Sequence, residues 1–193
     1  MQFYTVEECY IEHLRSVDDK VRITKGTRPY IGIVLTINNI TYLAPLTSYS
    51  KDKKEKFDSI NDNSLLSLKI YELGNEENRL GMVQLNNMIP VPSSEMCLID
   101  IDQIKKQDAK YAHLLKIQQI YLRKNKDILL KRAKKLYGAV NAQKSGKAAI
   151  NFIGHLSCDF KSLEAAMTTY AKPQKSTGLS QSKFEALLAK FSH

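Results

Sequence analysis

The sequence lacks the long apolar runs that mark membrane insertion or secretion. No window approaches the 18 consecutive apolar residues that a membrane-spanning helix requires. Near the start, Glu7, Glu8 and Glu12 interrupt the apolar run that a signal peptide would need. The sequence therefore predicts a cytoplasmic protein.

Cysteine is also scarce, and its pattern argues against a disulfide framework or a metal site. Cys9, Cys97 and Cys158 are odd in number, far apart in sequence and not in a CxxC motif. No histidine lies at ligand spacing from them, and the four histidines occur singly. We expect reduced, mostly buried thiols and no bound metal.

The common signatures of nucleotide and hydrolase chemistry are absent. The chain has no GxxxxGK[ST] loop, no GxGxxG, no HExxH and no GxSxG. ATP hydrolysis and metal catalysis are therefore not expected, and no cofactor is predicted.

Positive charge is abundant, and it is concentrated in one segment. The 193 residues carry a net charge of +9. Residues 105–135 alone contain 11 Lys and Arg against 2 Asp and Glu, whereas residues 1–104 are net negative. A cationic stripe of this density attracts phosphate backbones and favours a nucleic-acid partner. The alternative is a solvated helix face that keeps the protein soluble.

The order of predicted elements is strands first and helices last. Alternating and β-branched patterns predict strands over 2–5, 31–37, 40–46, 65–73, 79–85 and 96–101. Helices are expected over 6–15 (with Thr5 as N-cap and Glu8 completing a capping box), after residue 103 and over 162–170. The lysine-rich stretch 51–62 is too polar for a core element. Short connections favour an α+β fold with a strongly twisted, barrel-like antiparallel sheet of about six strands, flanked by helices.

One group of polar residues has the chemistry that RNA cleavage needs. Arg28 precedes the first strand of the 31–46 hairpin, and Thr47 and Ser48 follow the second strand, so both ends meet at one sheet edge. Lys51, Lys53 and Lys54 come next. Because the 2′-hydroxyl of RNA is itself the nucleophile, a protein needs only to orient the phosphate and stabilise its charge. The alternative is a simple turn followed by a soluble loop.

Five segments in order resemble a known family. They are MQFYTV…CYIEHL at the start, RPYIGIV at 28–34, YLAPLTS at 42–48, LGMVQLNNMIP at 80–90 and CDFKSLE at 158–164. Together they resemble the ToxN/AbiQ family, the endoribonuclease toxins of type III toxin–antitoxin systems. The resemblance covers residues 1 to about 170 and implies one toxin domain there. Residues 171–193 would form an extension, a linker followed by a short helix over 182–191.

The resemblance implies a fold similar to the Kid/MazF/CcdB toxins and metal-independent, sequence-selective cleavage of mRNA. The products would carry 2′,3′-cyclic phosphate and 5′-hydroxyl ends. The antitoxin would be a small pseudoknot RNA, which the toxin cuts from a tandem-repeat precursor and then joins in a closed multi-subunit complex. Free toxin would act in phage defence by abortive infection.

Family active-site positions map onto Arg28, Thr47, Ser48, a lysine near 51 and, more weakly, Tyr10. Some relatives have Lys in place of Arg28, and an arginine can stabilise charge but cannot act as a base. The lysine after Thr47-Ser48 comes one residue later than in relatives, so Lys51 or Lys53 is the functional one.

The resemblance also gives the basic region a role in holding RNA. Tyr111, Tyr121 and Tyr137 follow the apolar stripe and are expected to face the core rather than stack on bases. The predicted RNA-binding residues are Lys25, Lys53, Lys54, Lys105, Lys106, Lys110, Arg123, Lys124, Lys126, Lys131, Arg132, Lys134 and Lys135.

Two other functions use the same features. A non-catalytic RNA-binding protein would need the charge but not the Thr-Ser-Lys cluster. A gyrase-poisoning toxin on a similar fold would damage DNA and leave RNA intact.

Overall fold

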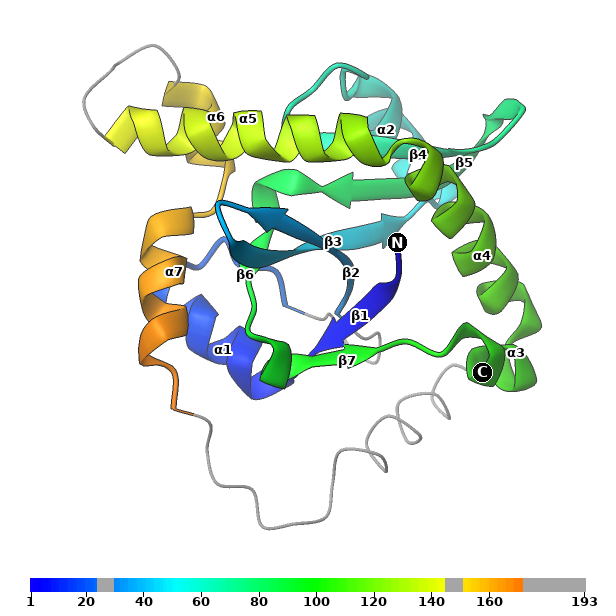
Figure 1. Cartoon of the computed structure of the whole chain (residues 1–193). Coiled ribbons are helices and arrows are strands. Elements are labelled where there is room, and N and C mark those ends of the chain that lie inside the picture. Colours follow the sequence, from blue (N-terminus) through cyan, green and yellow to red (C-terminus); the bar gives the residue numbers. More distant parts are fainter. Residues whose placement is uncertain (24–29, 145–150, 172–193) are drawn as a thin grey trace.

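A computed structural model describes residues 1–23, 30–144 and 151–171, and its centre is a mixed α+β core built on an antiparallel sheet. The order along the sheet is β4-β5-β3-β2-β1-β7, and the short β6 pairs with β3 (Figure 1). The strands are β1 (Phe3–Val6), β2 (Ile31–Ile37), β3 (Ile40–Ser48), β4 (Ser67–Glu72), β5 (Asn75–Gln84), β6 (Ile89–Pro90) and β7 (Met96–Leu98).

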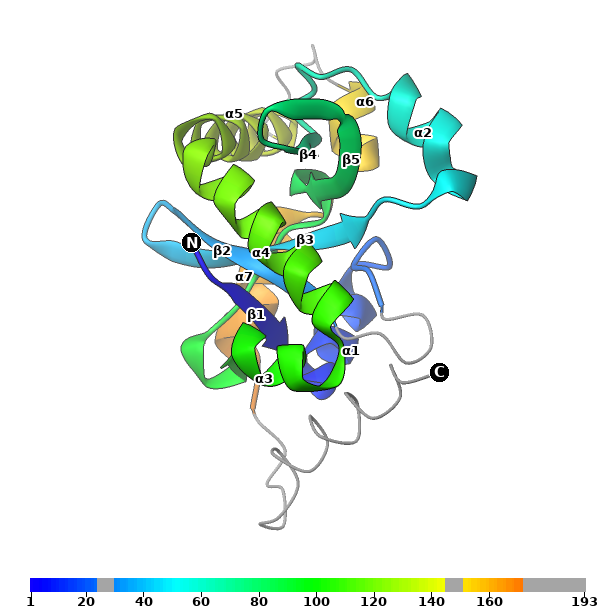
Figure 2. The same ribbon diagram turned by 90° about the vertical axis from the view of Figure 1, so that its right-hand side faces the viewer.

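Helices surround this sheet (Figures 1 and 2). Helix α4 packs against β4, α5 against β2, and α1 against α7, which also contacts β6. The helices are α1 (Glu8–Val17), α2 (Lys54–Ser59), α3 (Ile101–Gln107), α4 (Ala109–Lys124), α5 (Lys126–Lys144), α6 (Asn151–Leu156) and α7 (Phe160–Thr169), with 3-10 turns η1 (Lys51–Lys53), η2 (Leu85–Asn87) and η3 (Ser93–Glu95).

The predicted β2–β3 hairpin is confirmed, and its turn explains the sequence at its tip. Asn38 and Asn39 have positive φ angles of 48° and 63°. Asparagine tolerates this left-handed region better than other non-glycine residues, which suits a two-residue turn with the twist of the flanking strands. The pairing runs from Ile37 opposite Ile40 to Gly32 opposite Pro45.

The barrel-like closure that the sequence suggested is wrong. Strands β4 and β7 are the two ends of the strand order and do not pair with each other, so the sheet is open. Strand β3 is longer than β2, and the pairing of these two strands ends at Pro45. The last three residues of β3 pair with β5 instead, so the sheet extends sideways rather than closing.

Several local predictions need correction. Helix α1 begins two residues later than expected: Thr5 is a strand residue, and Glu7 precedes the helix without a side-chain cap. Of the strand predicted over 96–101, only Met96–Leu98 is extended in β7, and α3 then begins at Ile101 with Asp100 as its N-cap. The lysine-rich stretch contains η1 and α2, and Phe57 in α2 is buried, so this segment does contribute to packing.

The thiols are less uniform than expected. Cys158 is buried, and burial raises the pKa of its thiol to about 12, but Cys9 is half-buried and Cys97 is exposed. In the described ranges, no helix combines the length and apolar character needed to cross a bilayer. The linker and helix expected within 171–193 lie outside the described residues, except for residue 171.

A buried carboxylate ties the sheet to two helices. The side chain of Glu164, on α7, accepts hydrogen bonds at 2.7 Å from the hydroxyls of Tyr42 on β3 and Tyr137 on α5. Lys161 donates to its other oxygen at 2.8 Å. Burial pushes the pKa of Glu164 upward, but these hydrogen bonds outweigh burial and the pKa lies below its usual value. The ionised carboxylate is therefore the form that the fold stabilises.

We expect Glu164→Ala to lower the free energy of unfolding by about 3 kcal/mol, because it leaves two buried hydroxyls without an acceptor. Glu164→Gln keeps an acceptor oxygen and is expected to cost about 1 kcal/mol. Because the folded pKa is depressed, the advantage of Glu over Gln is full above the unfolded pKa of about 4.3 and is lost as pH falls through the folded pKa. Urea unfolding of the wild type and both variants at pH 7 and pH 3 measures these free energies. If Glu164→Gln lost the same free energy of unfolding at both pH values, the predicted pH dependence would be wrong.

Candidate functional site

The end of β3 is held in place by a close approach of β5. Thr47 pairs with Met82, and Ser48 pairs with Gly81. Gly81 has a φ of 145°, and a Cβ atom there would overlap the carbonyl oxygen of Thr47. Only glycine fits such a position, because both its conformation and the space beside it exclude a side chain. Gly81 therefore sets how closely β5 can approach the two candidate hydroxyl residues.

A buried amide fixes the same region from the helix side. The carbonyl oxygen of Leu80 accepts a hydrogen bond from the backbone N–H of Tyr49 at 3.2 Å. It also accepts one from Nε2 of Gln118, a buried side chain on α4, at 2.9 Å. Tyr49, the residue that follows β3, and Gln118 on α4 therefore meet at the carbonyl oxygen of Leu80 on β5.

Aromatic packing holds η1 and α2 beside the strand end. The rings of Tyr49 and Phe57 meet edge to face with centroids 5.3 Å apart, and Phe57 also contacts Tyr71. The guanidinium of Arg79 lies 5.9 Å from the Tyr49 ring centroid. Because Phe57 belongs to α2, this cluster fixes the segment that carries Lys51 next to Ser48.

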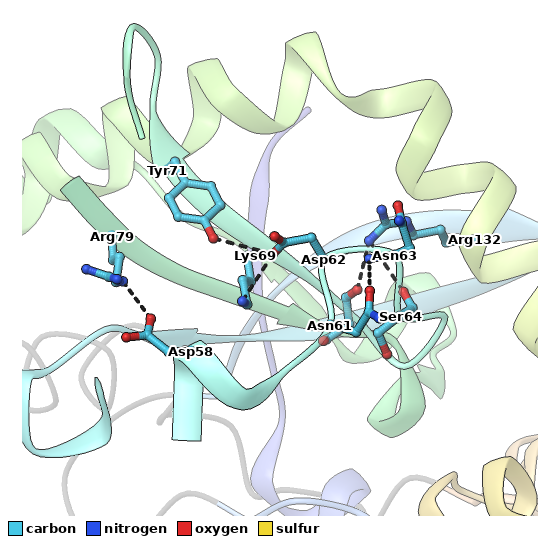
Figure 3. Close-up of polar contacts among 10 residues, drawn as sticks. Asp58, Asn61, Asp62, Asn63, Ser64, Lys69, Tyr71, Arg79 and Arg132 are labelled. Atoms are coloured by element: carbon cyan, nitrogen blue, oxygen red, sulfur yellow. Dashed lines mark hydrogen bonds and ion pairs between the residues drawn. The ribbon is translucent and has the colours of Figure 1, made fainter. Parts of the chain in front are cut away.

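Acidic residues neutralise two cations in this cluster (Figure 3). Nε of Arg79 lies 2.9 Å from Asp58, and the Lys69 ammonium lies 3.1 Å from Asp62. Lys51, by contrast, is exposed and has no ion pair within the described part of the chain. Of these three cations, Lys51 is therefore the one available to an incoming phosphate.

The candidate hydroxyls differ in access. Ser48 is exposed and Thr47 is half-buried. Successive side chains of a strand point to opposite faces, so Ser48 is the hydroxyl that a dissolved RNA reaches first. Thr47 and Ser48 thus end β3 with their side chains on opposite faces, and Lys51 follows at the start of η1. Arg28 and Lys25 lie outside the described residues, as does the side chain of Lys53.

Tyr10, the most weakly supported of the predicted site residues, lies apart from this group. It has no exposed surface, and its hydroxyl donates to the carbonyl oxygen of Pro90 at 2.8 Å. Its ring packs edge to face on Tyr170, and burial raises its pKa above the usual value. Pro90 pairs with Tyr42, five residues before Thr47, so Tyr10 is a core residue away from the strand end.

The basic helices present most of their cations to solvent. The predicted RNA-binding residues of α3, α4 and α5 are exposed, apart from Arg132. Arg132 is half-buried and donates to the carbonyl oxygens of Ser64 and Ser67 at 3.3 and 3.2 Å, so it is committed to the fold (Figure 3). Tyr137 is buried, and Tyr111 and Tyr121 pack half-buried against the core, as their spacing predicted.

Sequence reasoning missed Arg79 and Ser50 in this neighbourhood. Ser50 has a buried hydroxyl oxygen with no hydrogen-bond partner among the described residues. Arg79 is 31 residues from Ser48 in sequence, and only the register of β5 against β3 brings it close. No local motif could have indicated either residue.

Comparison with known proteins identifies the family of this chain. Residues 2–168 match the family model of toxin ToxN, type III toxin–antitoxin system. The chain is 36% identical over 172 residues to endoribonuclease ToxN from Bacillus thuringiensis subsp. kurstaki, covering 88% of this chain and 84% of that protein. The protein belongs to the ToxN family of type III toxin–antitoxin endoribonucleases. The predicted resemblance is therefore confirmed.

Solved structures of relatives share the fold. A type III toxin described as selectively inhibited by a non-coding RNA pseudoknot superposes with a TM-score of 0.74 at 33% identity, covering 89% of this chain and 98% of that one. AbiQ, a lactococcal anti-phage endoribonuclease of the same class of system, gives a TM-score of 0.73 at 31% identity, covering 89% of this chain and 98% of that chain.

We expect Gly81→Ala to lower the free energy of unfolding by about 2–3 kcal/mol, since alanine is strained at this φ and overlaps the Thr47 carbonyl. Gly138→Ala is the matched control: this helical glycine has no atom near the added methyl group, so alanine should stabilise by up to about 1 kcal/mol. Chemical denaturation of both variants measures the difference. Equal effects would show that the close approach at Gly81 is not required.

Proposed function

We propose that this toxin cuts RNA at the end of β3, with Ser48 and Lys51 contacting the scissile phosphate. One observation supports this most directly. Ser48, an exposed hydroxyl that β5 holds by strand pairing, and Lys51, an exposed cation with no ion pair among the described residues, lie three residues apart at the end of β3. Within an endoribonuclease family, that is a suitable surface for a phosphodiester.

The proposed reaction uses the substrate's own nucleophile. The RNA 2′-hydroxyl loses its proton to solvent and attacks the adjacent phosphorus, forming a 2′,3′-cyclic phosphate while the bond to the 5′ oxygen breaks. The leaving 5′ oxygen takes a proton from solvent and becomes a 5′-hydroxyl. Ser48 orients a phosphate oxygen by hydrogen bonding, Thr47 supports the strand end, and Lys51 stabilises the negative charge that builds up on the phosphate. No metal ion takes part in this scheme.

Arg28 is proposed as a second charge-stabilising group. It precedes β2, whose first residues pair with β1 and β3 near the same end of the sheet. An arginine stays protonated near neutral pH, so its role would be electrostatic and not that of a base. Between the two candidate lysines, we favour Lys51 because it is exposed and follows Ser48 most closely.

The partners are proposed from the relatives. One relative's toxin is inhibited by a non-coding RNA pseudoknot, and AbiQ is an anti-phage enzyme. We propose that this toxin likewise binds a small pseudoknot RNA cut from its own tandem-repeat precursor, assembles with it into a closed multi-subunit complex, and cuts mRNA in the cytoplasm of phage-infected cells. We also propose that the open sheet is related to that of the Kid/MazF/CcdB toxins. Residues 1–170 would form one domain, and the residues after 170 an extension.

We expect Ser48→Ala and Lys51→Ala each to slow cleavage of a synthetic RNA at least about 100-fold, equivalent to about 2.7 kcal/mol of lost transition-state stabilisation. The wild-type enzyme should keep its rate in EDTA and leave cyclic-phosphate ends, which gel mobility before and after phosphatase treatment detects. Thr168→Ala on α7 and Lys116→Ala on α4 are the controls, because both alter exposed positions on other elements.

Three results would contradict the proposal. Loss of wild-type cleavage in EDTA would indicate metal catalysis. Full activity of both variants would place the chemistry elsewhere. Salt-dependent RNA binding without any cleavage would favour the non-catalytic alternative.

A further inference from the structure

A cavity lies where strands β1 and β2 meet the junction between helices α4 and α5. Its volume is about 430 Å³, and it is lined by Met1, Gln2, Tyr4, Val34, Arg123 and Lys126. Tyr4 is on β1 and Val34 on β2, and Arg123 and Lys126 lie at the elbow (residues 123–126) where α4 ends and α5 begins. The elbow is fixed by Asn125, whose side-chain amide donates to the carbonyl oxygen of Tyr121 at 2.9 Å. The cavity is partly open to solvent, so a ligand bound there would remain partly exposed.

The charge of this cavity is uncompensated. Arg123 and Lys126 are exposed, and neither makes an ion pair or hydrogen bond within the ranges that the structure describes. No acidic residue lines the cavity. Lys116 on α4 differs, because its ammonium lies 3.0 Å from Asp102. Two converging cations without a counter-charge favour an anion such as a phosphate.

The floor of the cavity suits a flat ring. Tyr4 is half-buried, and its hydroxyl donates to Oε1 of Gln2 at 3.2 Å, which limits rotation of the side chain. Val34, on the neighbouring strand, adds an aliphatic surface. An aromatic ring beside cations is the usual combination for binding a base together with its phosphate.

The cavity is separate from the proposed cutting site. Val34 pairs with Leu43, and β3 runs four more residues, about 13 Å, before it reaches Thr47. Figure 2 shows the N-terminus and the end of β3, which leads to α2, on opposite sides of the molecule.

We infer that this cavity binds one nucleotide of an RNA, with its phosphate on Arg123 and Lys126 and its base against Tyr4. The identification of the ligand as RNA rests on the proposed function. The cavity is then an anchoring point for the strand, distinct from the place where the strand is cut.

The test is titration of uridine 5′-monophosphate and of inorganic phosphate into the full chain, followed by NMR or calorimetry. Arg123→Glu/Lys126→Glu is expected to weaken nucleotide binding at least 10-fold. Lys116→Glu reverses a charge on α4, the helix of Arg123, and is expected to change nucleotide affinity less than twofold. Tyr4→Leu is expected to weaken nucleotide binding several-fold and to leave phosphate binding unchanged. Thermal unfolding checks that each variant is folded.

Each outcome is decisive for the inference. Unchanged nucleotide binding in Arg123→Glu/Lys126→Glu, or an equal loss in Lys116→Glu, would overturn the site. Phosphate binding as tight as the nucleotide would overturn the role of Tyr4. A mononucleotide has no phosphodiester bond, so this measurement does not depend on cleavage. A protein that binds the nucleotide as expected but never cleaves RNA would refute the proposed function and leave this inference standing.

Discussion

The contact on which the candidate site depends is the approach of β5 to β3 at Gly81. With the Cβ atom absent there, the backbone of β5 can lie against the Thr47 carbonyl, and Ser48 is held by the pairing on the last residues of β3. Leu80 then offers its carbonyl oxygen to both Tyr49 and Gln118, which adds α4 to the same junction. A small exposed hydroxyl is useful for chemistry only when its backbone is fixed, and this junction supplies that rigidity.

The cations of the protein divide into two groups by their partners. Arg79, Lys69 and Arg132 are bound to carboxylates or backbone oxygens and hold α2 and the segment before β4 in place. Lys51, Arg123 and Lys126 have no such partner among the described residues and are exposed. The number of Lys and Arg residues therefore overstates the cations available to a phosphate, because some are already bound to carboxylates or backbone oxygens within the fold.

Sequence reasoning succeeded where a local pattern carries the information. The Asn38-Asn39 turn and the alternating strands around it follow from backbone preferences, and the apolar stripe on α4 and α5 follows from helical spacing. It failed where the outcome depends on long-range packing. Whether the sheet closes depends on which strand pairs with the end of β3, and Phe57 becomes a core residue only because Tyr49 and Tyr71 surround it. A family position does not reveal that Tyr10 is buried, and the contacts of Arg79 and Gly81 appear only once the register is known.

The proposed anchoring cavity would explain how one toxin could cut one RNA and be blocked by another. In-line attack requires the 2′-oxygen, the phosphorus and the leaving oxygen to align at the end of β3. Binding at Arg123 and Lys126 adds affinity but does not impose that alignment, because the two places lie on different parts of the sheet. Under this proposal, a flexible message anchored at the cavity could still align its phosphate at Ser48. A folded RNA anchored there would have a fixed backbone, so it could occupy the strand end without reacting. The same positive surface would then serve substrate and inhibitor, and the geometry at Ser48 would separate them.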